Sequence, residues 1–415
     1  MRIAIVNWSS RKAGGVETYL DSLRCALRSA GHETALFCEV DLPGDRAPIS
    51  LTGESPLWCV SSMGLEAAVY GLSGWHPDVI YGHGLSNPDV ETRTLEVAPA
   101  VLFAHGYRGT CISGNKAFKY PVVRPCSRHF GWQCVIHFYP HRCGGMSPIT
   151  MWRDFRRESR RLAMMHSYRA IVTASAHMRE EYLKHGFAPQ GIRLISPPAD
   201  HPELEPVSSF YGLGKWGAKR GGEVASDTAH KLLFVGRMEV IKGGGVFLEA
   251  LPRALSALGR PFRATFVGDG TERKKWEDKA ARMQASEPRL KIEFRGWLDG
   301  AQLRPVLRES DLLVVPSLWP EPFGLIGPEA GVHGLPAVAF DVGGIADWLK
   351  DGVNGCLAPG DPPSSEGLAN AIIRSLSDAA NYQRLRRCAV ESAWRFSLRT
   401  HVARLVDLFE EVTRC

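Results

Sequence analysis

Apolar residues recur along the first half of the chain in two alternating patterns. Short β-branched runs between polar loops predict strands at 2–7, 34–38, 79–81, 100–104, 170–174 and 193–195. After the first run, apolar residues between Val16 and Leu27 have helical spacing and Gly31 follows as a stop signal, which predicts a helix over 16–30. Such alternation indicates a parallel sheet covered by helices on both faces.

The same pattern restarts after a polar segment. Residues 201–229 carry two prolines and a cluster of glycines among charged side chains, which predicts a linker. Beyond it we expect strands at 231–235, 263–267, 291–294, 312–316 and 336–340, and helices at 245–258, 271–285, 301–309, 327–333, 365–377, 380–394 and 398–412. We therefore predict an α/β chain of the GT-B kind, with two Rossmann-like, doubly wound domains (1–200 and 230–394) facing a central cleft. We expect the last segment, 395–415, to be a helix that packs back on the first domain.

Composition and charge are those of a globular protein. The 415 residues are 44% hydrophobic and 23% charged, so a sizeable core can form. No apolar run approaches the roughly 20 residues that span a bilayer, and no signal-peptide pattern follows Met1, so we expect a cytoplasmic protein. The net charge of +6 is mild and gives no reason to expect a nucleic-acid partner.

Candidate chemistry is densest in residues 316–330, directly after an expected strand. The segment reads Pro-Ser-Leu-Trp-Pro-Glu-Pro-Phe-Gly-Leu-Ile-Gly-Pro-Glu-Ala. Its prolines and Gly324 predict a tight loop, and Pro328 suits the first turn of a helix whose free backbone N–H groups could face a phosphate. Glu321 then lies at the mouth of the loop and Glu329 within the first helical turn.

This segment resembles the Glu-x7-Glu motif of the family 4 retaining glycosyltransferases, with Glu321 and Glu329 at the two acidic positions. The resemblance implies a GT-B fold, a donor sugar at Glu321 and a nucleotide ribose at Glu329. It also implies that Phe323, Gly324 and Leu325 line the nucleotide-sugar site. Without the resemblance, Glu321 would be interpreted as a surface acid, and Glu329 as an acid at a helix N-terminus that the helix dipole stabilises.

A second motif supports the first. Residues 236–243 read Gly-Arg-Met-Glu-Val-Ile-Lys-Gly and resemble the family's Gly-Arg-x4-Lys-Gly pattern, which implies that Gly236, Arg237 and Lys242 hold the donor pyrophosphate. Arginine as a fork and lysine as a point charge suit that task. Gly268 and Gly296 end strands near where the family places the nucleotide base. Because the chain contains no Asp-x-Asp motif, we expect cations and helix dipoles, and no divalent metal, to stabilise the leaving diphosphate.

Three residues of the first half join this site through the same resemblance. Gly14 and Gly15, before the helix 16–30, resemble the family's N-terminal glycine loop, which approaches the donor phosphate and the acceptor. His105 follows the strand 100–104 and matches a cleft histidine that contacts the donor sugar. His105 therefore joins Glu321, Arg237 and Lys242 as a catalytic candidate.

The insert 106–150 after His105 is not in the minimal family pattern. It holds four of the chain's ten cysteines, with no Cys-x2-Cys spacing: Cys111, Cys126, Cys134 and Cys143. In a reducing compartment such a cluster suggests metal binding more than disulfides. A structural zinc on the four thiols, free or buried thiols, and disulfides all stay open. Its position makes the insert the candidate for acceptor recognition.

A basic stretch, Arg153 to Arg169, follows the insert. It carries six arginines and two acids, with Trp152, Phe155, Leu162 and Met165 roughly on one side of a predicted helix. One interpretation is peripheral contact with an anionic membrane. The other is a solvated basic face whose apolar side lies in the domain core.

The sequence thus predicts a hexosyltransferase that retains anomeric configuration. Its donor would be a UDP- or GDP-sugar, and its acceptor a hydroxyl of a glycan, a lipid-linked molecule or a small molecule, in glycan, polysaccharide or glycoconjugate synthesis. A nucleotide-sugar epimerase on the same fold and a non-catalytic sugar-nucleotide or glycan-binding protein are the alternatives. A dinucleotide-dependent oxidoreductase is disfavoured, because no Gly-x-Gly-x2-Gly follows the first strand.

Overall fold

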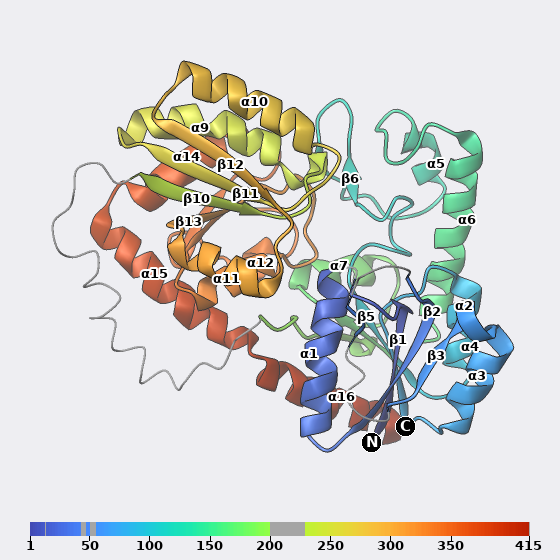
Figure 1. The fold of residues 1–415 in the computed structure, drawn as a ribbon. Helices are drawn as coiled ribbons and strands as arrows, with labels where there is room; N and C mark the ends of the chain where they lie inside the picture. Colours follow the sequence, from blue (N-terminus) through green and yellow to red (C-terminus); the bar gives the residue numbers. More distant parts are fainter. Residues whose placement is uncertain (13, 43–46, 50–54, 200–228, 415) are drawn as a thin grey trace. The chain divides into compact units, whose positions relative to one another are not determined.

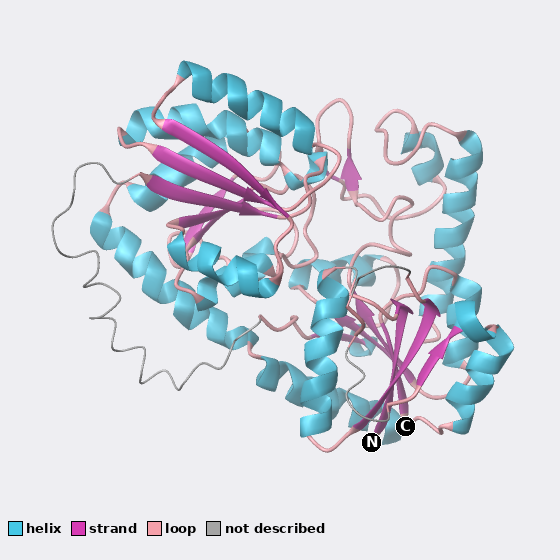
Figure 2. Ribbon diagram, viewed as in Figure 1, coloured by secondary structure: helices cyan, strands magenta, loops and turns pink. Residues whose placement is uncertain are grey.

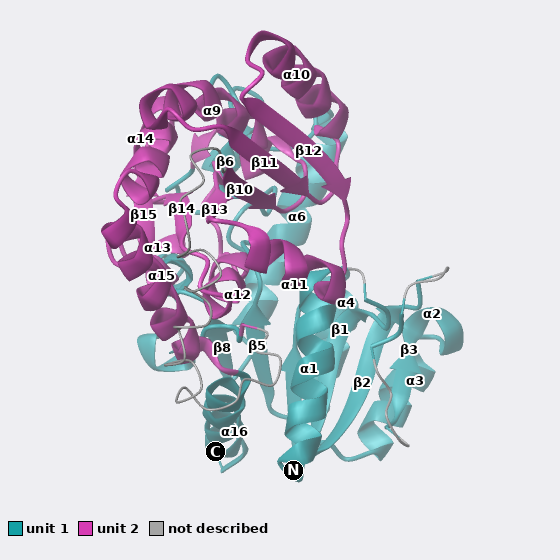
Figure 3. Ribbon diagram, turned by 60° about the vertical axis from the view of Figure 1, so that its left-hand side comes forward, with its two compact units in different colours: residues 1–122, 126–198, 398–415 teal, residues 123–125, 199–397 magenta. Residues whose placement is uncertain are grey.

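The computed structural model describes residues 1–12, 14–42, 47–49, 55–199 and 229–414 (Figure 1). The chain divides into two compact units, residues 1–122, 126–198 and 398–415 in one and residues 123–125 and 199–397 in the other (Figure 3). The predicted linker 201–229 lies outside the described residues except for its last position. Within the described ranges, no helix is both long and apolar enough to cross a bilayer.

The first unit alternates strands and helices from its first residues. Its elements are β1 (Arg2–Ser9), α1 (Gly15–Ser29), β2 (Glu33–Val40), β3 (Leu57–Cys59), α2 (Val60–Met63), α3 (Leu65–Gly74), β4 (Val79–Gly82), α4 (Pro88–Leu95), β5 (Ala100–Ala104), β6 (Ala117–Phe118), α5 (Gln133–Phe138), α6 (Pro148–Met165), β8 (Ala170–Thr173), α7 (Ala176–Lys184), η1 (Pro189–Gly191), β9 (Ile192–Leu194) and α16 (Leu398–Arg414).

Seven of these strands form one parallel sheet in the order β3-β2-β1-β4-β5-β8-β9. The strand order reverses direction between β1 and β4, so the loops after these two strands diverge and leave a crevice at the carboxyl edge, where open α/β sheets bind ligands. Helices α1 and α16 pack together on one face, and right-handed crossovers place α4 and α6 on the other. Helix α1 buries Tyr19, Leu20, Leu23 and Leu27, the apolar face that the sequence predicts.

The second unit repeats the plan. Its elements are β7 (Arg124–Pro125), β10 (His230–Val235), η3 (Val240–Lys242), α9 (Gly244–Leu258), β11 (Phe262–Val267), α10 (Arg273–Ser286), β12 (Leu290–Gly296), α11 (Gly300–Glu309), β13 (Leu312–Val315), α12 (Ile326–Val332), β14 (Ala337–Phe340), α13 (Ile345–Trp348), β15 (Gly355–Ala358), α14 (Ser365–Leu376), α15 (Ala379–Ala393) and η4 (Trp394–Phe396).

Its six-stranded parallel sheet has the order β12-β11-β10-β13-β14-β15. Figure 2 shows the strands of this sheet between two helical layers, which Figure 1 labels α9, α10 and α14 on one face and α11, α12 and α15 on the other. The order reverses between β10 and β13, so the loops after these two strands meet at the switch point. Strand β13 is fully buried, as expected of a strand covered on both faces.

The α/β fold predicted from the apolar pattern is therefore confirmed, and each predicted strand is present within two residues of its expected ends. The pattern missed the short edge strands β3 and β15. Strand β3 has only three residues, of which Leu57 is exposed and Trp58 half-buried, so it shows neither a buried run nor alternation. Strand β15 begins at Gly355 in a turn-rich stretch, which reads as a loop.

Candidate functional site

In the second unit, the loops after β10 and β13 lie in direct contact. The backbone N–H of Leu318 donates to the carbonyl of Ile241 at 2.8 Å. Gly243 has φ 71°, and a Cβ added there would lie 1.7 Å from the carbonyl oxygen of Pro316, so only glycine fits. This close approach brings Lys242, at the end of the first loop, beside the second loop.

Glu321 is the centre of this contact. Its Oε1 accepts hydrogen bonds from Lys242 Nζ at 2.6 Å, Ser317 Oγ at 2.6 Å and Trp319 Nε1 at 2.9 Å. Burial by itself would raise the pKa of Glu321, but the charge of Lys242 and the three donors outweigh burial and hold the pKa below its ordinary value. Glu321 is therefore an ionised carboxylate at neutral pH, buried and paired.

The structure joins two predicted site residues that the sequence assigned to different parts of the donor. Lys242 and Glu321 are 79 positions apart and form one ion pair, with Lys242 Nζ also 5.2 Å from the centre of the Trp319 ring. Arg237 lies outside this pair. Its guanidinium is 67% exposed and bonds Glu239 Oε1 at 2.8 Å, so it remains accessible to a ligand from solvent.

Three glycines form a backbone wall at the ends of neighbouring strands. Gly236 follows β10, Gly268 follows β11 and Gly296 ends β12. The N–H of Gly268 donates to the carbonyl of Gly296 at 2.7 Å. Gly268 has φ 125°, and a Cβ there would lie 2.0 Å from the carbonyl oxygen of Gly236. The three predicted glycines thus lie side by side at the sheet edge and contribute no side chain of their own.

A further glycine, Gly343, supports the backbone of Glu321. Gly343 has φ 60°, and a Cβ there would lie 2.4 Å from the carbonyl oxygen of Glu321. The next residue, Gly344, donates its N–H to that same carbonyl at 2.7 Å. The Gly343-Gly344 pair therefore fixes the main chain that carries the carboxylate.

The turn between Glu321 and α12 is formed by Phe323, Gly324 and Leu325. Gly324 has φ 85°, a conformation that favours glycine, and Phe323 is buried with its ring centre 5.3 Å from that of Phe396. Leu325 is the N-cap residue of α12. The three residues are rigidly placed in the loop that the motif predicted, and their contact with a nucleotide remains a prediction.

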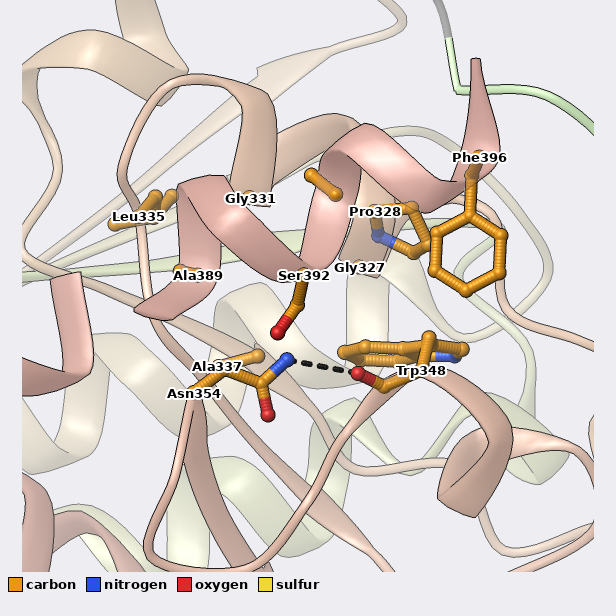
Figure 4. A pocket seen from close by; sticks show the side chains of 11 residues that line it. Gly327, Pro328, Gly331, Leu335, Ala337, Trp348, Asn354, Ala389, Ser392 and Phe396 are labelled. Atoms are coloured by element: carbon orange, nitrogen blue, oxygen red, sulfur yellow. Dashed lines mark hydrogen bonds between the residues drawn. The ribbon is translucent and has the colours of Figure 1, made fainter. Parts of the chain in front are cut away.

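Trp348 packs against Gly327 of helix α12, the helix that carries Glu329. Figure 4 shows the Trp348 indole beside Gly327, with Asn354 Nδ2 donating to the Trp348 carbonyl at 2.7 Å. A Cβ on Gly327 would lie 2.2 Å from the ring, and Trp348 Nε1 donates to the carbonyl of Phe323 at 2.6 Å. These contacts fix the helix, so Glu329 stands half-buried at a defined place in its first turn.

In the first unit, the predicted His105 lies beside a group of buried rings that sequence reasoning missed: Tyr19, Tyr81, His83 and His401. His83 Nδ1 and His105 Nε2 are 2.7 Å apart, directly after the neighbouring strands β4 and β5. Tyr19 OH lies 3.1 Å from Tyr81 OH and 2.8 Å from His401 Nε2. A histidine directly after β4, matching the one after β5, is the sequence signal that could have found His83.

The histidines of this group are uncharged at neutral pH. Burial, then the neighbouring His401, lowers the pKa of His105 to about 3. Burial likewise lowers the pKa of His401 to about 4, against the opposing effect of the Ser196 carbonyl. Burial, His105 and His401 hold the pKa of His83 well below its ordinary value. His105 can therefore donate or accept a hydrogen bond but carries no charge.

Gly14 and Gly15 lie at the N-terminus of α1, where Gly14 is the N-cap residue. Both are exposed, and a Cβ on Gly15 would meet no atom within 4 Å. The protein itself therefore does not require glycine at position 15. The open backbone is compatible with the close approach of a ligand, and that role remains a prediction.

The insert 106–150 is tied to the first unit by buried charges. Lys116 forms an ion pair with Glu181, both almost fully buried, and Gly109 N–H donates to Glu158 Oε2 at 2.8 Å. The four cysteines are unbridged and lie close enough together for every pair of thiols to interact electrostatically. Over the described residues, no group of three or more His, Cys, Asp or Glu side chains is arranged to hold a metal ion.

Helix α6 differs from its sequence interpretation at two positions. Arg161 is only 3% exposed and is paired with Glu91 at 3.0 Å and Glu158 at 3.6 Å, so it belongs to the interior of the unit and not to the basic face. Trp152, predicted on the apolar side, is 54% exposed. Tertiary ion pairs turn Arg161 inward, whereas the part of the chain that the structure describes leaves Trp152 largely exposed.

Two sequence-family models match this chain, one in each half. The sequence model described as Glycosyltransferase Family 4 matches residues 13–202, and the one described as Glycosyl transferases group 1 matches residues 229–378. A glycogen synthase of Mycobacterium tuberculosis is 24% identical over 94% of this chain and 89% of its own length. A D-inositol 3-phosphate glycosyltransferase of Stackebrandtia nassauensis is 32% identical over 49% of this chain and 45% of its own.

Solved structures share the fold over nearly the whole chain. Anabaena HepE in complex with UDP and glucose has a TM-score of 0.65, with 19% identity and 99% of each chain covered. The sucrose-phosphate synthase of Thermosynechococcus elongatus has a TM-score of 0.65 and 20% identity, and the match covers 99% of this chain and 98% of that one.

Proposed function

The chain belongs to the family 4 glycosyltransferases and is a sugar-transferring enzyme, and from that premise we propose that it transfers a hexose from a nucleoside diphosphate to an acceptor hydroxyl with retention of configuration. The observation that carries this proposal is the buried, ionised Glu321 bound to Lys242 at the switch point of the second unit. Open α/β sheets bind their ligands at such a point.

In the proposed reaction, the bond between the anomeric carbon and the diphosphate oxygen breaks, and the acceptor oxygen bonds to the same face of that carbon. Lys242 and Arg237 stabilise the negative charge that develops on the leaving diphosphate. The ionised Glu321 accepts hydrogen bonds from donor-sugar hydroxyls and orients the ring. The acceptor proton passes to a diphosphate oxygen, so no further base is needed.

The glycine wall supports the placement of the nucleotide. Gly236, Gly268 and Gly296 place backbone without side chains at the carboxyl ends of β10, β11 and β12, and we place the flat base against that backbone. We place the ribose hydroxyls beside Glu329, which is fixed in the first turn of α12. We propose a UDP- or GDP-sugar as donor; the structure of HepE with UDP and glucose supports the former.

The first unit contributes His105 in the proposed reaction. Because His83 occupies one of its ring nitrogens at 2.7 Å, the other ring nitrogen is the one that can bond a donor-sugar hydroxyl. The exposed Gly14 and Gly15 and the insert 106–150 are proposed to approach the donor phosphate and the acceptor, which would be a glycan, a lipid-linked molecule or a small molecule.

The test is a transfer assay with a panel of UDP- and GDP-sugars and simple sugar acceptors. We expect release of nucleoside diphosphate coupled to product formation, with the anomeric configuration of the product read by NMR. Glu321→Ala should reduce transfer by at least about 100-fold, the scale of losing a transition-state contact. Near-normal turnover by this variant would overturn the assignment. Donor conversion without acceptor would favour an epimerase, and tight binding without turnover a binding protein.

A structural metal on Cys111, Cys126, Cys134 and Cys143 remains a prediction. Metal analysis of the purified protein, with a Cys126→Ser/Cys134→Ser variant as control, distinguishes thiol-bound zinc from free thiols. About one zinc per chain, lost in the variant, is expected for a four-thiolate site. A fully folded protein that contains no zinc would contradict the prediction of a structural metal.

A further inference from the structure

Large apolar side chains are unusually exposed around helices α5 and α6 of the first unit. Half of those exposed among the described residues lie between Tyr120 and Trp152. Ile149 is 81% exposed and Trp152 is 54% exposed, both on the first two turns of α6. The others are Trp132 and Ile136 at α5, Met146 in the loop before α6, and Tyr120 and Val122 further upstream. Soluble proteins rarely leave such a concentration uncovered without a binding partner.

The same face carries a row of arginines. Arg153, Arg156, Arg157 and Arg160 line a groove of about 920 Å³ together with Ile149, Trp152, Pro148 and residues 86–89. The exposed positions Ile149, Trp152, Arg153, Arg156 and Arg160 recur at helical spacing, so they lie on one side of α6.

The protein neutralises these arginines only in part. Arg153 and Arg157 share Asp154, and Arg157 also bonds Glu158 at 2.9 Å. Arg160 reaches Asp89 only at 3.9 Å, with both side chains well exposed. Arg156 takes part in no ion pair or hydrogen bond among the described residues. The groove lining therefore holds four arginines against one carboxylate, which fits an anionic partner.

We propose that this face of α5 and α6, the Trp132–Arg160 surface, docks on an anionic lipid bilayer. Tryptophan and long aliphatic side chains favour the boundary between headgroups and acyl chains, and arginines beside them bind lipid phosphates. An acidic protein would satisfy the arginines but gives no reason for Ile149 and Met146 to be 81% and 68% exposed. A soluble polyanion has the same shortcoming.

The surface is rigidly connected to the candidate active site of its own unit. The inward-facing Arg161 anchors the second half of α6 through Glu91, and its Nη2 donates to the carbonyl of Ser86 at 3.0 Å. Ser86 lies three residues after His83, which bonds His105. A lipid surface at the groove would therefore present membrane-borne molecules close to the edge of the sheet that carries His105.

Vesicle co-sedimentation of the full chain tests the proposal without any assay of transfer. We expect binding to vesicles of phosphatidylcholine with about one-third phosphatidylglycerol, weakening as salt rises, and little binding to pure phosphatidylcholine. Arg153→Glu/Arg156→Glu/Arg160→Glu should weaken binding by on the order of 100-fold, since each arginine near the surface contributes roughly 5-fold. Ile149→Ser/Trp152→Ser should weaken it by at least about 10-fold at every salt concentration.

Matched controls lie on the same chain. Lys274→Glu/Lys275→Glu/Arg282→Glu makes the same change in charge on the exposed side of α10, and Tyr70→Ser removes a side chain that is as exposed as Ile149. Both controls should bind vesicles like the wild type. The proposal would be overturned by an equal loss of vesicle binding in the α10 control or by no vesicle binding of the wild type. It would also be overturned if the wild type bound a soluble acidic protein or polyanion and not the vesicles. Nucleotide binding by the same variants should be unchanged, so a failure here is separable from a failure of the proposed function.

Discussion

Lys242→Met is the substitution that probes the candidate donor site most sharply. It removes the ammonium that Glu321 binds at 2.6 Å and keeps the apolar stem. Glu321 then stays buried, with Ser317 Oγ and Trp319 Nε1 still donating to it. We expect the free energy of unfolding at neutral pH to fall by about 2–3 kcal/mol, below the range for a fully buried pair because Lys242 keeps some solvent contact.

The pH dependence of this loss has a defined sign. In the wild type the pKa of Glu321 lies below its ordinary value of 4.5, so its contribution to stability is present above that value and is lost as pH falls through the folded pKa. In Lys242→Met, burial prevails over the two uncharged donors and raises the pKa of Glu321. The contribution of Glu321 is then lost as pH rises through its folded pKa, so the gap between the two proteins should widen from pH 5 to pH 7.5.

Urea unfolding followed by far-UV circular dichroism measures this gap. The set needed is the wild type, Lys242→Met, Glu321→Gln and the double variant at both pH values. We expect a coupling energy of about 1.5–3 kcal/mol at pH 7.5. Lys274→Met, which removes an exposed lysine paired with Asp278, is the control and should change stability by less than about 0.5 kcal/mol. A coupling energy near zero, or a gap independent of pH, would refute the reasoning.

Three further substitutions test other parts of the account. His83→Phe removes one of the histidines whose pKa is lowered, so the free energy of unfolding should fall less steeply as the pH drops from 6.5 to about 4. Transfer should fall about 10-fold because His105 loses its partner. An unchanged pH dependence of the free energy of unfolding would count against the lowered pKa of His83. Gly343→Ala places a Cβ 2.4 Å from the Glu321 carbonyl and should cost about 2–3 kcal/mol of stability in urea unfolding, so wild-type unfolding would contradict the geometry. Lys116→Met leaves its buried carboxylate partner without a cation and should cost about 3–5 kcal/mol, and a loss below about 1 kcal/mol would show that the pair is solvated.

The sequence could predict what depends on local pattern. Apolar runs located the strands because parallel strands are buried along their whole length, as β13 is. Gly236 was found through the Gly-Arg-x4-Lys-Gly resemblance, and Gly268 and Gly296 because they stand at strand ends near where that family places the base. These signals lie within a few residues, so they need no knowledge of the fold.

What the sequence could not predict depends on convergence of distant segments. The bond between Lys242 and Glu321 joins residues 79 positions apart, and the contact between Tyr19 and His401 joins residues 382 apart. Arg161 looks like its arginine neighbours in the sequence, yet two buried carboxylates draw it inward. No periodicity encodes such pairings, because the partner lies on another element.

Donor-induced thermal stabilisation of the wild type and of Lys242→Met tests the central claim most directly. The claim predicts that at least one UDP- or GDP-sugar stabilises the wild type, by about 2.7 kcal/mol at 100 times its dissociation constant. It also predicts a clearly smaller effect on Lys242→Met at the same concentration. No stabilisation by any nucleotide sugar, or equal stabilisation of both proteins, would contradict a donor site built around Lys242 and Glu321.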